Sequence, residues 1–422
     1  MKFLSQTPKS RSEPKIAISA RKLLFKASGF SLTVLINVLS GLATFPIVIL
    51  KLGPDLWATL SVAQSLGILG AVLIGWGWNI MGPATVATLN TKERGIEYLE
   101  AMYSRGWLFL FVSPLVVLFA LWLCHGDQVA MAAACLAAII SALGATWFYV
   151  GESSPSRLLT HSTLPTLGFS LLSVTVLLYS NSILIYSLVQ LMSSLCVLAI
   201  SSKDILGRYP RTERVEAGLV PSLFRLSRNS HGLVAAMTIS LYMNGPLVLV
   251  SIYAPVSLPV YAFADKILKY LRAVVTSFTQ VTQGYVPSGP KELLSNRIRT
   301  SLFIATTFGV AVSIFYALSL NLLRFFFAQE LGPIPANLSV PLGLSLACIS
   351  ISSVLSFAIL PAIDKSGIVA RINLMGASVG ITFFATLGWK LGASGIAWSV
   401  ALAELLILVA AAMVANKHSR GR

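Results

Sequence analysis

Apolar residues dominate this chain in long runs, and short polar segments separate one run from the next. Each run is about 20 residues long, the length at which an α-helix crosses the hydrocarbon core of a bilayer. The pattern therefore predicts about twelve membrane-spanning helices. They cover residues 28–50, 56–80, 106–124, 129–150, 158–179, 183–201, 232–253, 258–284, 301–323, 338–362, 368–388 and 393–415.

The longest polar segment, residues 202–231, follows the sixth span and divides the predicted helices into two equal halves. We expect an all-α polytopic membrane protein in which two six-helix bundles, residues 28–201 and 232–415, surround a central cavity. Residues 202–231 would be a cytoplasmic linker between the bundles. A basic cytoplasmic tail, residues 1–27, would precede the first bundle, and a short tail, residues 416–422, would follow the second.

Composition supports the membrane assignment and gives it an orientation. Hydrophobic residues make up 56% of the chain and charged residues 11%, whereas soluble domains carry about 25% charged residues. With both termini in the cytoplasm, 24 of the 31 lysines and arginines fall in cytoplasmic segments, and only Lys51, Arg324 and Lys390 fall outside. The positive-inside rule accounts for this asymmetry. The net charge of +16 is thereby explained without a nucleic-acid partner.

The predicted eighth span carries four charged residues, Asp265, Lys266, Lys269 and Arg272. A charge near the bilayer centre is costly and is kept where it faces protein or water, so such residues indicate a functional site. Helical spacing places Asp265, Lys269 and Arg272 on one face, which would suit an anionic passenger. Asp265 and Lys269 are also four residues apart and could form a structural ion pair.

Other polar residues within spans offer further candidates. Glu404, near the middle of the last span, could bind a coupling proton or cation, pair with Arg272 or Lys269, or make a packing hydrogen bond. Asn244, Gly245 and Pro246 predict a break or kink in the seventh span that would suit a gate. His161 in the fifth span could relay protons or be a hydrogen-bonded core histidine.

Several segments together resemble bacterial polysaccharide flippases of the multidrug/oligosaccharidyl-lipid/polysaccharide exporter superfamily. Pro46 in the first span is followed by the turn Leu52-Gly53-Pro54, as at the start of those proteins. The fourth span ends in WFYVGES at 147–153, which is similar to their aromatic-x-x-Gly-x-Glu pattern. The segments 251–267 and 391–408 resemble their seventh-to-eighth-span turn and their last span, the latter with a buried glutamate.

The resemblance implies that the chain translocates an undecaprenyl-pyrophosphate-linked oligosaccharide repeat unit, such as an O-antigen or exopolysaccharide unit, to the outer leaflet of the bacterial inner membrane. Lys269 and Arg272, with Lys266 and Asp265 beside them, would then surround the pyrophosphate. Membrane lipids, a polysaccharide polymerase and chain-length proteins would be its partners. No cofactor, metal site or catalytic residue is expected, because the sequence has no GxxxxGK[ST], HExxH or GxSxG motif.

Two alternatives remain open. A cation-coupled multidrug antiporter of the same superfamily would need acidic residues in its cavity, whereas basic residues predominate in these spans. A membrane enzyme of polysaccharide assembly would be expected to carry a large external loop or an acidic catalytic motif. The longest predicted external loop, about residues 324–337, is short and contains one acidic residue, Glu330.

Overall fold

A computed structural model describes residues 13–420 except 210–215, 229, 287–290 and 364. The described residues form helices and connecting turns, without strands. The long helices are α1 (Glu13–Leu52), α2 (Pro54–Gly75), α4 (Thr91–Leu123), α5 (Gln128–Ile140), α8 (Leu164–Ser180), α9 (Ile183–Arg208), α11 (Ser230–Tyr253), α12 (Leu258–Tyr285), α13 (Leu294–Phe327), α14 (Ala336–Val354) and α16 (Ser366–Arg420). Shorter helices are α3 (Trp78–Thr88), α6 (Thr146–Gly151), α7 (Pro155–Leu158), α10 (Leu219–Arg228) and α15 (Leu360–Ala362), and π-helical turns η2 (Leu159–Thr163) and η5 (Leu355–Ile359) precede α8 and α15.

Ten helical stretches among the described residues are long and apolar enough to cross a membrane. One of them, within α16, reverses direction at Gly392 and so accounts for two crossings. The charged α12 is not among the ten, although its 28 residues are long enough to span a bilayer. Counting α12 and dividing α16 gives twelve spans and confirms the predicted all-α polytopic fold.

The reversal in α16 requires glycine at its turn and small residues beside it. Gly392 has φ 60° and ψ −139°, a conformation in which a Cβ atom would be strained. The two arms then pack closely, since a Cβ atom at Gly380 would lie 2.9 Å from the Cβ of Ala403. Glu404 therefore follows directly after a tight helix-helix contact that fixes its position.

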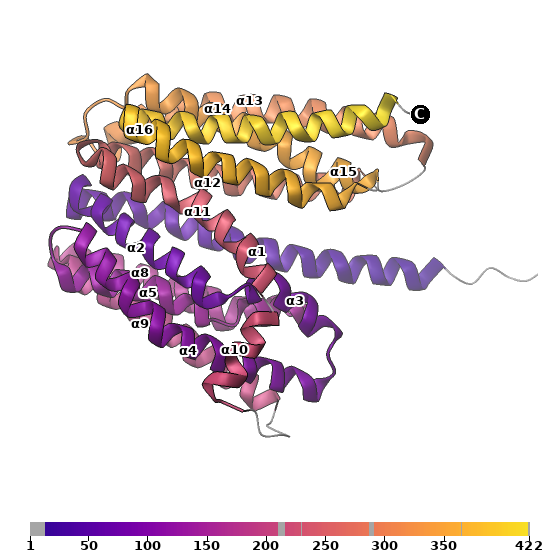
Figure 1. The fold of residues 1–422 in the computed structure, drawn as a ribbon, viewed down its shortest axis with the longest axis horizontal. Helices are drawn as coiled ribbons and strands as arrows, with labels where there is room; N and C mark the ends of the chain where they lie inside the picture. The colour runs from indigo at the N-terminus through magenta and orange to yellow at the C-terminus, as the bar shows by residue number, and fades with distance from the viewer. Residues whose placement is uncertain (1–12, 210–215, 229, 287–290, 364, 421–422) are drawn as a thin grey trace, which may run out of the picture.

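The helices pack in two groups joined along a seam (Figure 1). Helices α2, α4, α5, α8 and α9 contact one another in the first group, and α12, α13, α14 and α16 in the second. Helix α11 packs against both α16 and α2, while α1 packs against α8 and also reaches α12 and α13. The start of α1 and the end of α16 lie toward the same end of the molecule (Figure 1).

Large apolar side chains remain exposed along the outside of both groups, as expected of helices that face lipid. Leu115 and Trp122 on α4 and Phe303 and Leu318 on α13 are among the most exposed. The sequence pattern alone could not separate this lipid-facing surface from the core, because both surfaces are apolar.

Several predicted boundaries differ from the structure. Helix α1 begins at Glu13, within the predicted basic tail, and residues 1–12 lie outside the described part. Helix α4 begins at Thr91 rather than 106, because Asn90 and Glu93 form a capping box. The predicted linker 202–231 contains the end of α9 and the whole of α10.

Of the break or kink predicted at Asn244–Pro246, the structure shows no break. Helix α11 runs without interruption from Ser230 to Tyr253, with Pro246 inside it. The side-chain amide of Asn244 donates to the Ser240 carbonyl, one turn earlier in the helix, at 3.3 Å. Packing of α11 against α2 and α16 holds the helix together there, as neighbouring helices commonly do for proline in membrane spans.

Candidate functional site

Helix α12 presents its charged residues in two ion pairs. The first lies within the helix, where the ammonium of Lys269 is 2.8 Å from the Asp265 carboxylate, one turn earlier. The Asp265 side chain is nearly buried, whereas that of Lys269 is 26% exposed. The ion pair that the spacing allows is therefore present, and the ammonium keeps one accessible side.

The second ion pair connects α12 to the last arm of α16. A terminal nitrogen of Arg272 lies 3.3 Å from Glu404 Oε1, and the Tyr242 hydroxyl of α11 donates to the same oxygen at 2.9 Å. The Arg272 guanidinium also lies over the Tyr242 ring, 5.8 Å from its centre. Glu404 is buried, while Arg272 is 26% exposed, so the arginine is the member of the pair that a ligand can reach.

Lys266 faces a different neighbour from the other three charged residues. Its ammonium lies 5.8 Å from the centre of the Tyr270 ring. Tyr270 in turn packs against α1, where a Cβ atom at Gly41 would lie 2.6 Å from the Tyr270 hydroxyl. Lys266 therefore lies beside the contact between α1 and α12, on the seam between the helix groups.

The candidate gate residue Asn244 lines a groove at the seam between α11 and α2–α3. The groove has a volume of about 370 Å³, and Asn79, Ile80, Ile239 and Ser240 are among its other lining residues. Near the groove the backbones almost touch, because a Cβ atom at Gly77 would lie 2.5 Å from the carbonyl carbon of Gly232. Asn244 thus lies at the contact of the two helix groups, on an unbroken helix.

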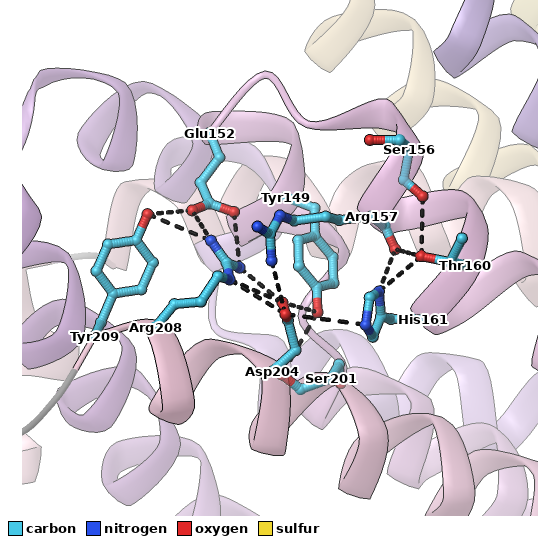
Figure 2. Close-up of polar contacts among 10 residues, drawn as sticks. All are labelled: Tyr149, Glu152, Ser156, Arg157, Thr160, His161, Ser201, Asp204, Arg208 and Tyr209. Carbon is cyan, nitrogen blue, oxygen red and sulfur yellow. Dashed lines mark hydrogen bonds and ion pairs between the residues drawn. The ribbon is translucent and has the colours of Figure 1, made fainter.

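A second ionic cluster joins segments at the ends of three predicted spans in the first group. Arg208 of α9 lies 2.6 Å from Glu152, which follows α6, and 2.7 Å from Asp204, one turn earlier in α9 (Figure 2). Arg157 of α7 reaches the other oxygen of Asp204 at 2.7 Å. Sequence reasoning noted Glu152 only within a motif and missed its partners, although the spacing of Asp204 and Arg208 is a helical ion-pair signal.

The structure brings Arg272 and Glu404 together and pairs Asp265 with Lys269, whereas the Lys266 ammonium lies over the Tyr270 ring. Within the described residues, no group of three or more histidine, cysteine, aspartate or glutamate side chains is placed to hold a metal ion. The arrangement presents two partly accessible cations, each with a carboxylate partner. Such a surface can bind an anion by exchanging one negative partner for another.

No family model matches the sequence, and no curated protein matches it. Solved structures do resemble it. The inward-facing conformation of a multidrug resistance MATE family transporter of the MOP superfamily has a TM-score of 0.64 at 14% identity, covering 92% of this chain and 94% of that one. The lipid II flippase MurJ in an inward closed conformation has a TM-score of 0.63 at 15% identity, covering 90% and 87%.

At these identities the likeness shows the fold alone. The chain has the fold shared by MATE transporters and the MurJ flippase of the MOP superfamily, over nearly its whole length. The similar structures are a multidrug resistance transporter and a lipid II flippase.

Proposed function

We propose that this protein translocates an oligosaccharide linked to undecaprenyl pyrophosphate from the inner to the outer leaflet of the bacterial inner membrane by alternating access. The observation that carries the proposal is the pair of accessible cations, Lys269 and Arg272, on a helix inside a membrane-spanning fold. Pyrophosphate is the part of such a lipid that needs cationic partners when it leaves the headgroup region.

Arg272 would be the principal ligand. Its planar guanidinium offers several donors, and phosphate oxygens match them in bidentate geometry. Among the described residues its ion-pair partner is Glu404, at 3.3 Å, so the contact is loose enough for phosphate to compete. Lys269 would supply a second cation from the preceding turn, and Lys266 would lie at the seam between α1 and α12.

Glu404 would couple binding to the conformational change. When the pyrophosphate draws Arg272 away, the buried carboxylate keeps only the Tyr242 hydroxyl as a partner. A buried carboxylate that loses its cation takes up a proton or another cation. Because Tyr242, Arg272 and Glu404 belong to α11, α12 and α16, this exchange would loosen the contacts among these three helices together.

The proposal is tested by lipid analysis of a deletion strain complemented with variants. Complete, unpolymerised pyrophosphate-linked repeat units should accumulate without the protein and with Arg272→Gln, and should disappear with the wild-type chain. Arg371→Gln, which removes an exposed arginine of α16 outside the site, is the matched control. Absence of such a lipid in the deletion strain, with an active glycan pathway, would contradict the proposal.

A cation-coupled multidrug antiporter is the second candidate function, because the MATE transporter is as similar in fold as MurJ. The buried acidic residue Glu404 is the feature that an antiporter would use. An antiporter would make the deletion strain sensitive to cationic drugs. Complementation with Arg272→Gln should then restore normal drug resistance, whereas complementation with Glu404→Gln should not. A membrane enzyme of polysaccharide assembly fits the transporter-like fold less well.

A further inference from the structure

Helix α10 packs one side against the protein and leaves a row of apolar side chains exposed on another. Its ten residues, Leu219–Arg228, extend about 15 Å, which is too short to cross a bilayer. The helix lies beside α4, where the Leu226 side chain is buried. Val220, Leu223 and Phe224, here called the apolar row, are 76%, 54% and 75% exposed. Such a row indicates a surface that contacts lipid or another protein.

An ion pair and hydrogen bonds fix the direction in which the apolar row points. Arg225 lies 3.2 Å from Glu100 of α4 and also donates to the Glu216 carbonyl at 2.9 Å. The indole of Trp76, at the end of α2, donates to the Leu226 carbonyl at 2.7 Å. These contacts hold α10 against α4 and against the corner between α2 and α3. The apolar row is therefore held facing outward.

The start of α10 adjoins the lipid-facing surface of α4. The Trp107 indole of α4 donates to the carbonyl of Ala217, two residues before α10, at 2.9 Å. The Trp107 ring stacks on Phe111, one turn further along α4, with 6.3 Å between the ring centres. Phe111 and its neighbour Leu110 are both more than half exposed, on a helix long and apolar enough to cross a membrane. Because tryptophan is enriched where a membrane meets water, this contact places α10 at the level at which α4 enters the bilayer.

The polar residues of α10 fit the same environment. The Ser227 hydroxyl, on the exposed side, donates to the Phe224 carbonyl at 2.8 Å and so needs no water partner. The Ser222 hydroxyl likewise donates within the segment, to the Gly218 carbonyl at 2.9 Å. Arg225 follows Phe224 by about 100° around the helix, so its charge lies to one side of the apolar row. A short helix with separate apolar and charged sides is typical of segments that lie in a membrane surface.

We infer that α10 lies in the membrane surface, on the side of the bilayer where α9 ends and α11 begins, with the apolar row among the lipid acyl chains. This surface lies outside α12 and does not depend on the proposed function. Its consequence reaches the seam between the helix groups. Trp76, which donates to α10, directly precedes Gly77, where a Cβ atom would lie 2.5 Å from the carbonyl carbon of Gly232 in α11. The lipid-bound helix therefore supports the corner at which α2 and α3 meet α11.

Spin labels on the full-length protein in nanodiscs test the inference. The labels are attached singly at Val220→Cys and Phe224→Cys, in a chain whose four native cysteines are replaced by alanine. Collision rates are measured with oxygen, which concentrates among acyl chains, and with a nickel chelate, which stays in water. Both labels should lie about 5–10 Å below the lipid phosphates. Leu115→Cys, on the exposed side of α4, is the acyl-chain reference, and Lys92→Cys, exposed at the start of α4, is the water reference.

Either of two results would overturn the inference. Labels on the apolar row that collide with the nickel chelate as often as the Lys92→Cys label does would place the row in water. Labels shielded from both reagents would show that another protein, or another segment of this chain, covers the row in place of lipid. Two label positions are used so that a disturbance of the helix at one of them is recognised by disagreement with the other.

Discussion

Arg272 and Glu404 meet at 3.3 Å although one lies on α12 and the other on the returning arm of α16. Glu404 is buried and also accepts a hydrogen bond from Tyr242, while Arg272 keeps about a quarter of its side chain exposed. Because of this difference in exposure, the Glu404 carboxylate stays in place, whereas the Arg272 guanidinium can exchange one anionic partner for another.

Removing the cation of this pair should destabilise the protein more than removing both charges. In Arg272→Gln the buried Glu404 loses its ion-pair partner, a change that costs about 3–5 kcal/mol for buried pairs. In the double variant Arg272→Gln/Glu404→Gln most of this loss should be recovered. Thermal unfolding in one detergent gives the unfolding midpoints of the wild type, Arg272→Gln and the double variant. A double variant with a lower midpoint than Arg272→Gln would contradict this prediction.

Recovery of stability in that double variant should not restore transport. Arg272, the residue proposed to bind the phosphate, is absent from the single and the double variant. Lipid-linked repeat units should therefore accumulate equally in strains complemented with either variant. Restored transport in the double variant would show that Arg272 acts only as the partner of Glu404.

Tyr242→Phe isolates the hydroxyl that supports Glu404. The ring contacts with Arg272 and Phe384 remain, but the hydrogen bond of 2.9 Å is lost. Loss of a donor to a buried charged group costs about 1–3 kcal/mol, so the unfolding midpoint should fall. Tyr253→Phe, on an exposed tyrosine of the same helix, is the control and should leave it unchanged.

The close packing of the two arms of α16 should make Gly380 sensitive to a single methyl group. A Cβ atom there would lie 2.9 Å from the Cβ of Ala403 and 3.0 Å from the Tyr242 ring. Ala403 directly precedes Glu404 in the chain. Gly380→Ala should therefore lower the unfolding midpoint. Gly245→Ala, where nothing lies within 4 Å, should raise or preserve it, because alanine favours a helix by about 1 kcal/mol over glycine.

The Glu152–Arg208 pair should be important for folding of the first group. Arg208→Ala leaves two buried carboxylates with one remaining arginine, so a loss of about 3–5 kcal/mol is expected for the broken pair. Arg299→Ala, at an exposed arginine of α13, provides the comparison. Equal yields of folded protein from both variants by size-exclusion chromatography would contradict this role.

The sequence predicted the spans well because each apolar run has the length of a bilayer crossing. It also offered the Asp265–Lys269 pair as one alternative, because that pair depends only on helical spacing. It left the Arg272–Glu404 pair among several alternatives, because that contact depends on how α12 packs against α16. The Glu152–Arg208 pair could not be predicted either, because its two residues are 56 positions apart and meet only through helix packing. Helix α11 is not broken at Pro246, where a break or kink was expected, because packing against α2 and α16 overrides the local preference.

The most direct measurement of the central claim follows the substrate across a membrane. A lipid-linked oligosaccharide would be confined to the inner leaflet of proteoliposomes that contain the purified protein, and a membrane-impermeant glycosidase outside would report its arrival. Vesicles with the wild-type chain or Arg371→Gln should expose the glycan, and vesicles with Arg272→Gln should behave like protein-free vesicles. Exposure by the wild-type chain no faster than in protein-free vesicles would contradict the account.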